Sequence, residues 1–166
     1  MGFNVEQFEE MVRATLQDLG EKYAKQEAVD LLMLTAAQES HLGHYLYQLG
    51  GGPACGVFQM EPSTHTDLYT NYLKFRPAEE RAAIRHKSAL GSVVADLALN
   101  LLYQIVVARL QYWRKPGAIP KPEDFEDRYD YVEALAAYWK EHWNTEEGRG
   151  TIKEAVDNYY RYVESA

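Results

Sequence analysis

The amino-acid sequence predicts an all-α protein that folds as a single domain over residues 1–166. Nowhere does a strict alternation of apolar and polar residues persist long enough to indicate a β-sheet. Apolar residues recur instead at helical spacing, and the segments that carry them begin and end at residues typical of helix termini. With 166 residues and 46% hydrophobic content, the chain can bury a substantial core without a second domain.

The first half of the chain divides into four predicted helices. A helix capped by Asn4 and ending near residues 20–25 has the inward face Val5, Phe8, Met11, Val12, Leu16 and Leu19. A second helix over residues 27–40 contains the run 31–38, which is too apolar on every side for a surface helix, so we expect it to cross the interior. A glycine-rich loop through residues 50–53 follows, and Pro62 and Pro77 then open helices that reach about Tyr72 and Lys87.

The second half contains three more predicted helices. The longest apolar pattern begins near Ser92 and continues to Pro116, which predicts one central helix over this range. A proline-rich linker then leads to a helix from Pro122 to about Trp143. Thr151 and Glu154 form a capping box for a last helix, whose predicted buried face is Ile152, Val156, Tyr159 and Val163.

Composition and charge exclude several classes of function. The formal charge of −8, from 25 acidic and 17 basic residues, argues against an unaided nucleic-acid binder and a polybasic membrane surface. No segment approaches the roughly 18 consecutive apolar residues of a membrane span, and residues 1–6 lack the features of a signal peptide. Cys55 is the single cysteine, which excludes an internal disulfide. We expect no nucleic-acid partner and no membrane insertion.

Glu39 is the residue whose position points most directly to chemistry. It closes the apolar run over residues 31–38 and shares a helix face with Thr35 and Leu32. Desolvation and the negative end of the helix dipole are both expected to raise its pKa, to about 6. A carboxyl group of this kind retains a protonated fraction near neutral pH, as a general acid requires. The alternative is a solvated glutamate at a helix end, as most glutamates in such places are.

Three short motifs give the chain a resemblance to a known family: Ala-Ala-Gln-Glu-Ser at 36–40, Gly-Val-Phe-Gln-Met at 56–60 and Ala-Ala-Tyr at 136–138. The chain resembles the lytic transglycosylases. It is most similar to small lysozyme-like proteins of tailed bacteriophages, which are related to soluble lytic transglycosylases and goose-type lysozymes. The resemblance covers roughly residues 28–145. It implies a lysozyme-like helical fold of about six to eight helices, in agreement with the pattern above.

The resemblance also implies a reaction and a set of site residues. The reaction is cleavage of the β-1,4 bond between N-acetylmuramic acid and N-acetylglucosamine in peptidoglycan, with no metal and no cofactor. Glu39 corresponds to the family's acid/base, and the serine after it supports the glutamate by hydrogen bonding. The positions carried over as substrate-binding are Ser40, Gln59, Met60 and Tyr138. This chain departs from the family at Trp139, where the family has asparagine, and in the loop over residues 50–55.

Two alternatives to a transglycosylase remain open at the level of sequence. A hydrolytic lysozyme needs a second carboxylate, for which Glu61 and Asp67 are the nearest candidates, although no motif fixes either. A non-catalytic virion structural or adaptor protein could keep the fold without cleaving anything. The net negative charge slightly favours this second alternative, whereas the retained Glu39, Ser40 and Gln59 argue for an enzyme.

The resemblance further implies where the protein acts and with which partners. A phage-encoded protein of this kind is made in the cytoplasm of the bacterial host and is not exported by a signal peptide of its own. It acts on peptidoglycan glycan strands at the periplasmic cell wall, either free in the lysing cell or as a component of the virion, and the sequence leaves both open. Its expected protein partners are phage tail or other virion proteins.

Other constellations in the sequence are weaker. His41 and His44 lack a third ligand at the spacing of a zinc site, and Cys55 lacks the surroundings of a catalytic thiol. A basic cluster with aromatic neighbours consists of Arg109, Arg114, Lys115 and Lys121 with Tyr112 and Trp113. Cations at a helix end that satisfy its dipole are the favoured explanation of this cluster. The aromatic candidates for the cleft are Tyr45, Tyr47, Tyr69 and Trp139.

Overall fold

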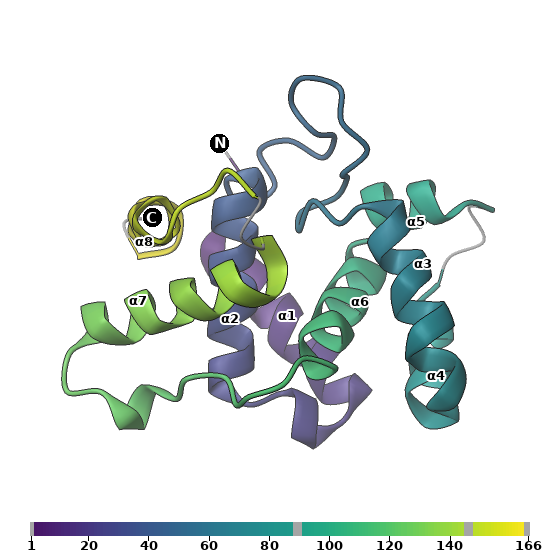
Figure 1. The fold of residues 1–166 in the computed structure, drawn as a ribbon, viewed down its shortest axis with the longest axis horizontal. Coiled ribbons are helices and arrows are strands. Elements are labelled where there is room, and N and C mark those ends of the chain that lie inside the picture. The colour runs from purple at the N-terminus through teal and green to yellow at the C-terminus, as the bar shows by residue number, and fades with distance from the viewer. Residues whose placement is uncertain (1, 88–90, 145–147, 165–166) are drawn as a thin grey trace.

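The computed structural model of the chain is built from helices (Figure 1). It describes residues 2–87, 91–144 and 148–164, and these residues form eight α-helices and no β-strand, which confirms the predicted all-α class. The helices are α1 (Val5–Leu19), α2 (Gln26–Ser40), α3 (Pro62–Asn71), α4 (Pro77–Arg85), α5 (Val93–Leu99), α6 (Leu101–Trp113), α7 (Arg128–Trp139) and α8 (Ile152–Tyr159).

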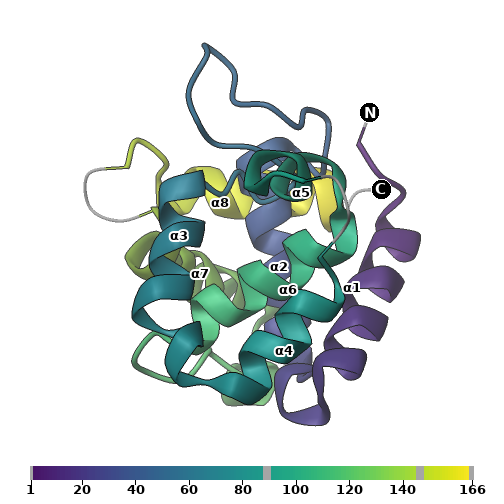
Figure 2. The same ribbon diagram turned by 90° about the vertical axis from the view of Figure 1, so that its right-hand side faces the viewer.

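Helix α2 lies at the centre of the molecule. It contacts α1, α6, α7 and α8, and every residue from Ala28 to Ala37 is buried, as the apolar run predicts. Figure 1 shows α7 and α8 on one side of α2, with α3, α4, α5 and α6 on the other. The loop between α2 and α3 projects beyond the helices in both views (Figures 1 and 2). The C-terminal end of α2 therefore leads from the core directly into this loop.

The predicted central helix over residues 92–116 is wrong as a continuous element, because the chain turns at Asn100. Helices α5 and α6 meet there at 101°. Asn100 has extended backbone angles, and its side chain accepts a hydrogen bond from the Tyr103 amide at 3.3 Å and donates to the His86 carbonyl at 2.7 Å. No single helix in the described ranges has the length and apolarity of a membrane span, although α5 and α6 reach both when joined.

Other helix boundaries follow their predicted capping residues. The Asn4 side chain accepts a hydrogen bond from the Gln7 amide, and the capping box of Thr151 and Glu154 is present. The predicted start at Pro122 is instead a short 3-10 turn, and α7 begins only after its cap Asp127. A π-helical turn over Lys140–Asn144 extends α7, and a second one over Tyr160–Glu164 extends α8.

Four side chains on predicted inward faces are less buried than expected. Met11 of α1 is 39% exposed, and Val5 of α1 and Ile152 and Val163 in the last helix are half-buried. The outermost positions of an amphipathic stripe lie at the edge of the packed face, which explains their exposure.

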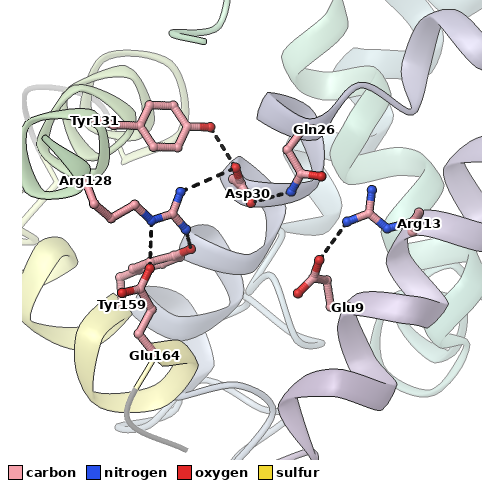
Figure 3. Close-up of polar contacts among 8 residues, drawn as sticks. All are labelled: Glu9, Arg13, Gln26, Asp30, Arg128, Tyr131, Tyr159 and Glu164. Atoms are coloured by element: carbon pink, nitrogen blue, oxygen red, sulfur yellow. Dashed lines mark hydrogen bonds and ion pairs between the residues drawn. The ribbon is translucent and has the colours of Figure 1, made fainter. Parts of the chain in front are cut away.

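A polar network holds α7 and α8 against α2 (Figure 3). The buried Asp30 carboxylate accepts hydrogen bonds from Gln26 at 2.9 Å and from the Tyr131 hydroxyl at 2.8 Å. Arg128 donates to the Tyr159 hydroxyl and to Glu164, both at 2.8 Å, and its guanidinium lies 3.9 Å from Asp30. The network therefore joins three helices, and it supplies polar partners to the buried Asp30 carboxylate, which would be costly to bury alone.

Candidate active site

The end of α2 forms part of the wall of a cavity of about 680 Å³. Its other walls come from the loop between α2 and α3, the start of α3, α6, and residues 143–144 and 148–150. The polar side chains that line it include Gln38, Glu39, Tyr45, Gln59, Glu61 and Arg149. A hollow of this size with several convergent polar groups is the usual form of a ligand site.

Glu39 reaches this cavity from the last turn of α2. Its side chain is half-buried, and its Oε1 accepts a hydrogen bond from Trp139 Nε1 at 3.0 Å. Burial raises the pKa of Glu39 to about 7, and the hydrogen bond from Trp139 opposes part of that rise. The shift has the predicted direction, and desolvation is its cause, as expected from the apolar run. Near neutral pH, the carboxyl group is therefore poised between its acid and base forms.

The backbone immediately after Glu39 has an unusual conformation. His41 and Leu42 adopt positive φ angles of 52° and 57°, although neither is glycine. Among the described residues, the remaining non-glycine with positive φ is Gln59, at 45°, and it lines the same cavity. Each such residue costs about 1–3 kcal/mol, and strain of this kind clusters at functional sites. The strained backbone thus coincides with the predicted site.

Ser40 does not hydrogen-bond Glu39 in the way that the resemblance implied. Its hydroxyl donates to the Val57 carbonyl at 2.6 Å and accepts from the Gly43 amide at 2.8 Å. The side chain is fully buried, so it cannot contact a substrate either. Since residues 40 and 39 point to different sides of a helix, Ser40 faces the loop while Glu39 faces the cavity. Ser40 therefore fixes the motif at 56–60 against the end of α2.

The turn over residues 56–60 is held from several sides. Gly56 has φ 81°, and a side chain there would collide with the Leu97 carbonyl oxygen and with Gln104. Gln104 Oε1 accepts a hydrogen bond from the Val57 amide at 2.6 Å, and Gln59 Nε2 donates back to the Gly56 carbonyl at 2.8 Å. Gln59 lines the cavity, as does Met60, although the Met60 side chain is only 3% exposed. The turn places Gln59 in the same cavity as Glu39.

Tyr138 is absent from the described lining of this cavity, contrary to its predicted role. It lines a different cavity, together with Arg109 and Tyr112. The next residue, Trp139, is the one that contacts Glu39. Successive residues on a helix are turned by about 100°, so Tyr138 faces this second cavity while Trp139 is buried against Glu39. Trp139, the position at which the resemblance in sequence breaks off, therefore contacts the predicted acid/base.

The other predicted site residues fall into two groups, those that line the cavity of Glu39 and those that lie elsewhere. Glu61 and Tyr45 line the cavity, whereas Asp67 forms an ion pair with Arg114 at 2.7 Å and is not among the described lining residues. Tyr47 is 59% exposed on the projecting loop. The Tyr69 hydroxyl accepts a hydrogen bond from Tyr103, away from this cavity.

Arg149 is a lining residue that the sequence did not single out. It follows Gly148, whose carbonyl accepts a hydrogen bond from Lys140 Nζ at 2.8 Å. A side chain at Gly150 would lie 2.7 Å from the Trp139 ring, so glycine lets the chain pass close to that indole. The signal in the sequence was a single arginine between two glycines, which by itself indicates only a loop.

A second hollow of about 510 Å³ adjoins the first. The two share Gln38, Tyr45, Arg149 and Gly150, and the second continues toward Asn158 and Arg161. Together they provide a continuous polar surface that starts beside Glu39.

Within the described residues, no group of three or more His, Cys, Asp or Glu side chains is arranged to hold a metal ion. The rings of His41 and Tyr162 stack at 4.8 Å, so His41 packs against the last helical turn. Comparisons of the chain with family models, with curated proteins and with solved structures gave no match.

Proposed function

We propose that the protein is a peptidoglycan lytic transglycosylase that cleaves the β-1,4 bond between N-acetylmuramic acid and N-acetylglucosamine, with Glu39 as its general acid/base. The observation that carries this proposal is the carboxyl group of Glu39, whose pKa is raised to about 7 and which lines a polar cavity of about 680 Å³. Gln59 in the same cavity and the polar hollow that adjoins it support a polysaccharide substrate.

The proposed reaction uses one carboxyl group twice. Protonated Glu39 donates its proton to the glycosidic oxygen, and the bond from that oxygen to the muramic acid C1 breaks. The resulting Glu39 carboxylate then takes the proton from the C6 hydroxyl of the same sugar, whose oxygen closes on C1. The product is a 1,6-anhydro end, and Glu39 is protonated again. A pKa near the working pH suits both steps.

The products of peptidoglycan digestion test the proposal. Purified protein is incubated with peptidoglycan, and the fragments are analysed by mass spectrometry. We expect 1,6-anhydro ends. Reducing ends would instead indicate a hydrolytic lysozyme, and a complete absence of fragments would favour a non-catalytic virion protein.

Matched variants of two carboxylates in the same cavity identify the acid/base. Glu39→Gln keeps the acceptor oxygen for Trp139 but has no proton to donate, so we expect cleavage to fall by at least about 10². Glu61→Gln is the control, and near-normal turnover is expected for a one-carboxylate reaction. Near-normal turnover of Glu39→Gln, with the fold confirmed by circular dichroism, would remove Glu39 from the mechanism.

The hydrolytic alternative is favoured by one observation, the presence of Glu61 in the cavity of Glu39. Glu61 accepts a hydrogen bond from Ser63 at 3.1 Å and remains exposed, so it is available to activate a water molecule. In that case, Glu61→Gln would lose activity together with Glu39→Gln. The pair of variants thus separates the two reactions independently of the product analysis.

The proposed biological setting is local degradation of a bacterial cell wall by a bacteriophage. In this setting, the substrate is the peptidoglycan glycan strand, and phage tail or other virion proteins are the partners. The protein would reach the periplasmic wall as part of a particle made in the host cytoplasm.

A further inference from the structure

A cavity of about 250 Å³ lies apart from the candidate active site. In the described parts of the chain, it shares no lining residue with the cavity of Glu39. Its walls come from the turn between α1 and α2, the end of α6, the following loop, and Tyr138 of α7. The basic cluster noted in the sequence contributes Arg109, Lys115 and Lys121 to this cavity.

The lining is strongly basic in an acidic protein. The cationic side chains around the cavity are Lys22, Lys25, Arg109, Lys115 and Lys121, against one described carboxylate, Glu27. The whole chain carries a formal charge of −8, so this concentration of positive charge is local. Cations that merely satisfy the dipole at the end of α6 do not account for Lys22 and Lys25, which come from another part of the fold.

Arg109 gives the cavity a buried donor. Its side chain is only 4% exposed, and its Nε donates to the Tyr23 carbonyl at 2.9 Å. The N–H groups on its two terminal nitrogens have no acceptor among the described residues. These two nitrogens are also not fully enclosed by protein. Since Arg109 lines the cavity, these N–H groups are directed at the open space. Burial lowers the pKa of Arg109 to about 10, which leaves it charged at neutral pH.

Two of these cations pack against the same indole at the edge of the cavity. The guanidinium of Arg109 lies 5.0 Å from the centre of the Trp113 ring, and the ammonium of Lys22 lies 5.5 Å from it. Glu79 offsets Lys22 in part, at 3.7 Å. A bound anion would accept hydrogen bonds from the Arg109 N–H groups that have no acceptor among the described residues, and it would pair with the lysines around them.

We propose that this cavity is a binding site for a doubly charged phosphate group, held by Arg109 with Lys115, Lys121 and Lys25. The planar guanidinium suits the oxygens of phosphate, and several lysines neutralise more charge than one carboxylate carries. Lys25 is also the N-terminal residue that flanks α2, a helix end with no side-chain cap. Free inorganic phosphate and a phosphate ester share this chemistry, and the test distinguishes them.

Calorimetric titration of the full chain tests the site. The probes are inorganic phosphate, pyrophosphate and glycerol 3-phosphate, with succinate as a dicarboxylate of similar charge, all at matched ionic strength. We expect saturable binding of the phosphate probes and much weaker binding of succinate. Stronger binding of glycerol 3-phosphate than of inorganic phosphate would identify an ester as the ligand, and the reverse would identify the free ion. The absence of saturable binding by any phosphate probe, or equal binding of succinate, would overturn the proposal.

Paired charge variants show whether the binding belongs to this cavity. The double variant Lys115→Gln/Lys121→Gln should bind pyrophosphate about tenfold more weakly. Lys74→Gln/Lys153→Gln removes the same charge from exposed lysines outside the cavity and should bind as the unmodified protein does. Equal weakening in both would mean a diffuse charge effect and contradict the site.

Two further variants keep the test independent of folding and of the active site. If the double variant is unstable in thermal unfolding, Lys25→Gln alone, at an exposed position, should still weaken binding about threefold. Unchanged binding in that variant would count against the proposed role of Lys25. Glu39→Gln should bind pyrophosphate normally, because its side chain lies in the other cavity. A loss of binding in Glu39→Gln would contradict a separate site.

Discussion

At the scale of single residues, two opposing effects set the pKa of Glu39. Burial favours its protonated form, while the hydrogen bond from Trp139 favours the carboxylate. The result is a pKa of about 7 rather than the ordinary value of 4.5. A group in this position is useful for proton transfer but costly for folding, because the unfolded chain ionises it more easily.

The stability of the protein should therefore depend on pH through Glu39. The folded-state pKa is raised above the unfolded value, so the folded state binds the extra proton and loses stability as pH rises from about 4.5 to about 7. Glu39→Gln removes the ionisation, and we expect it to raise the free energy of unfolding by about 2–3 kcal/mol near pH 8, with little gain near pH 4. Urea unfolding at both pH values measures the difference. An equal effect at the two pH values would contradict the raised pKa.

Trp139 should set the upper pH limit of activity. Trp139→Phe removes the Nε1–H donor that stabilises the Glu39 carboxylate, so the pKa of Glu39 should rise by about one unit. The basic limb of the pH–rate profile should then move to higher pH, with a loss of stability of about 1–3 kcal/mol from the smaller ring. A basic limb that moves downward would show that Trp139 does not act on the carboxylate.

At the scale of elements, the sequence predicted the structure best where a hydrophobic pattern allows only one environment for a helix. The apolar run of α2 can lie only in the interior, so both its burial and the raised pKa of Glu39 could be predicted. The break at Asn100 could not, because an apolar pattern continues on both sides of it. Asn100 is the C-cap of α5 and the N-cap of α6. The residues beside it in the sequence do not indicate this double role.

The candidate site shows the same limit. The order of the motifs predicted that Glu39 and Gln59 lie together, and both line one cavity. This could be predicted because the buried helix and the turn that follows it are both determined by residues close to them in the sequence. It misplaced Tyr138, because the rotation of α7 decides which of two adjacent aromatic residues faces Glu39. Arg149 was missed because its position depends on how residues 148–150 pack against α7.

The turn that carries Gln59 should be sensitive to one added methyl group. Gly56→Ala forces a positive φ on alanine and a collision with the Leu97 carbonyl, so we expect a loss of about 2–4 kcal/mol and reduced cleavage. Gly50→Ala is the control, because Gly50 has a similar φ of 88° but no atom within 4 Å. Its cost should be about 1 kcal/mol. Thermal unfolding compares them, and equal losses would exclude the collision as the cause.

At the scale of the whole molecule, α8 is held in place mainly by its contacts with α2 and α7. Tyr159 is buried, and Arg128 joins it to Glu164 and to the region of Asp30 (Figure 3). Burial raises the pKa of Asp30 in spite of its hydrogen bonds from Gln26 and Tyr131. The docking of α8 also matters to the site, because Asn158 bonds Gln38 beside Glu39.

Arg128 should therefore contribute more than a surface ion pair of similar geometry. Arg128→Met breaks its hydrogen bonds to the Tyr159 hydroxyl and to Glu164 and removes the positive charge beside the buried Asp30, so we expect a loss of about 1–2 kcal/mol in the free energy of unfolding. Arg13→Met removes a single pair with Glu9, at 2.7 Å, and should cost less than about 1 kcal/mol. Denaturant unfolding of the two variants checks the contrast, and similar losses would show that the network does not hold α8.

The buried Cys55 gives the molecule an internal reporter of loop motion. It pairs through its backbone with Met60 and with Tyr47, and its side chain is only 3% exposed. As the single thiol of the chain, it can be labelled without ambiguity. Reagents reach it only when the hairpin behind Gln59 opens, so the labelling rate under native conditions measures how often that side of the cavity comes apart.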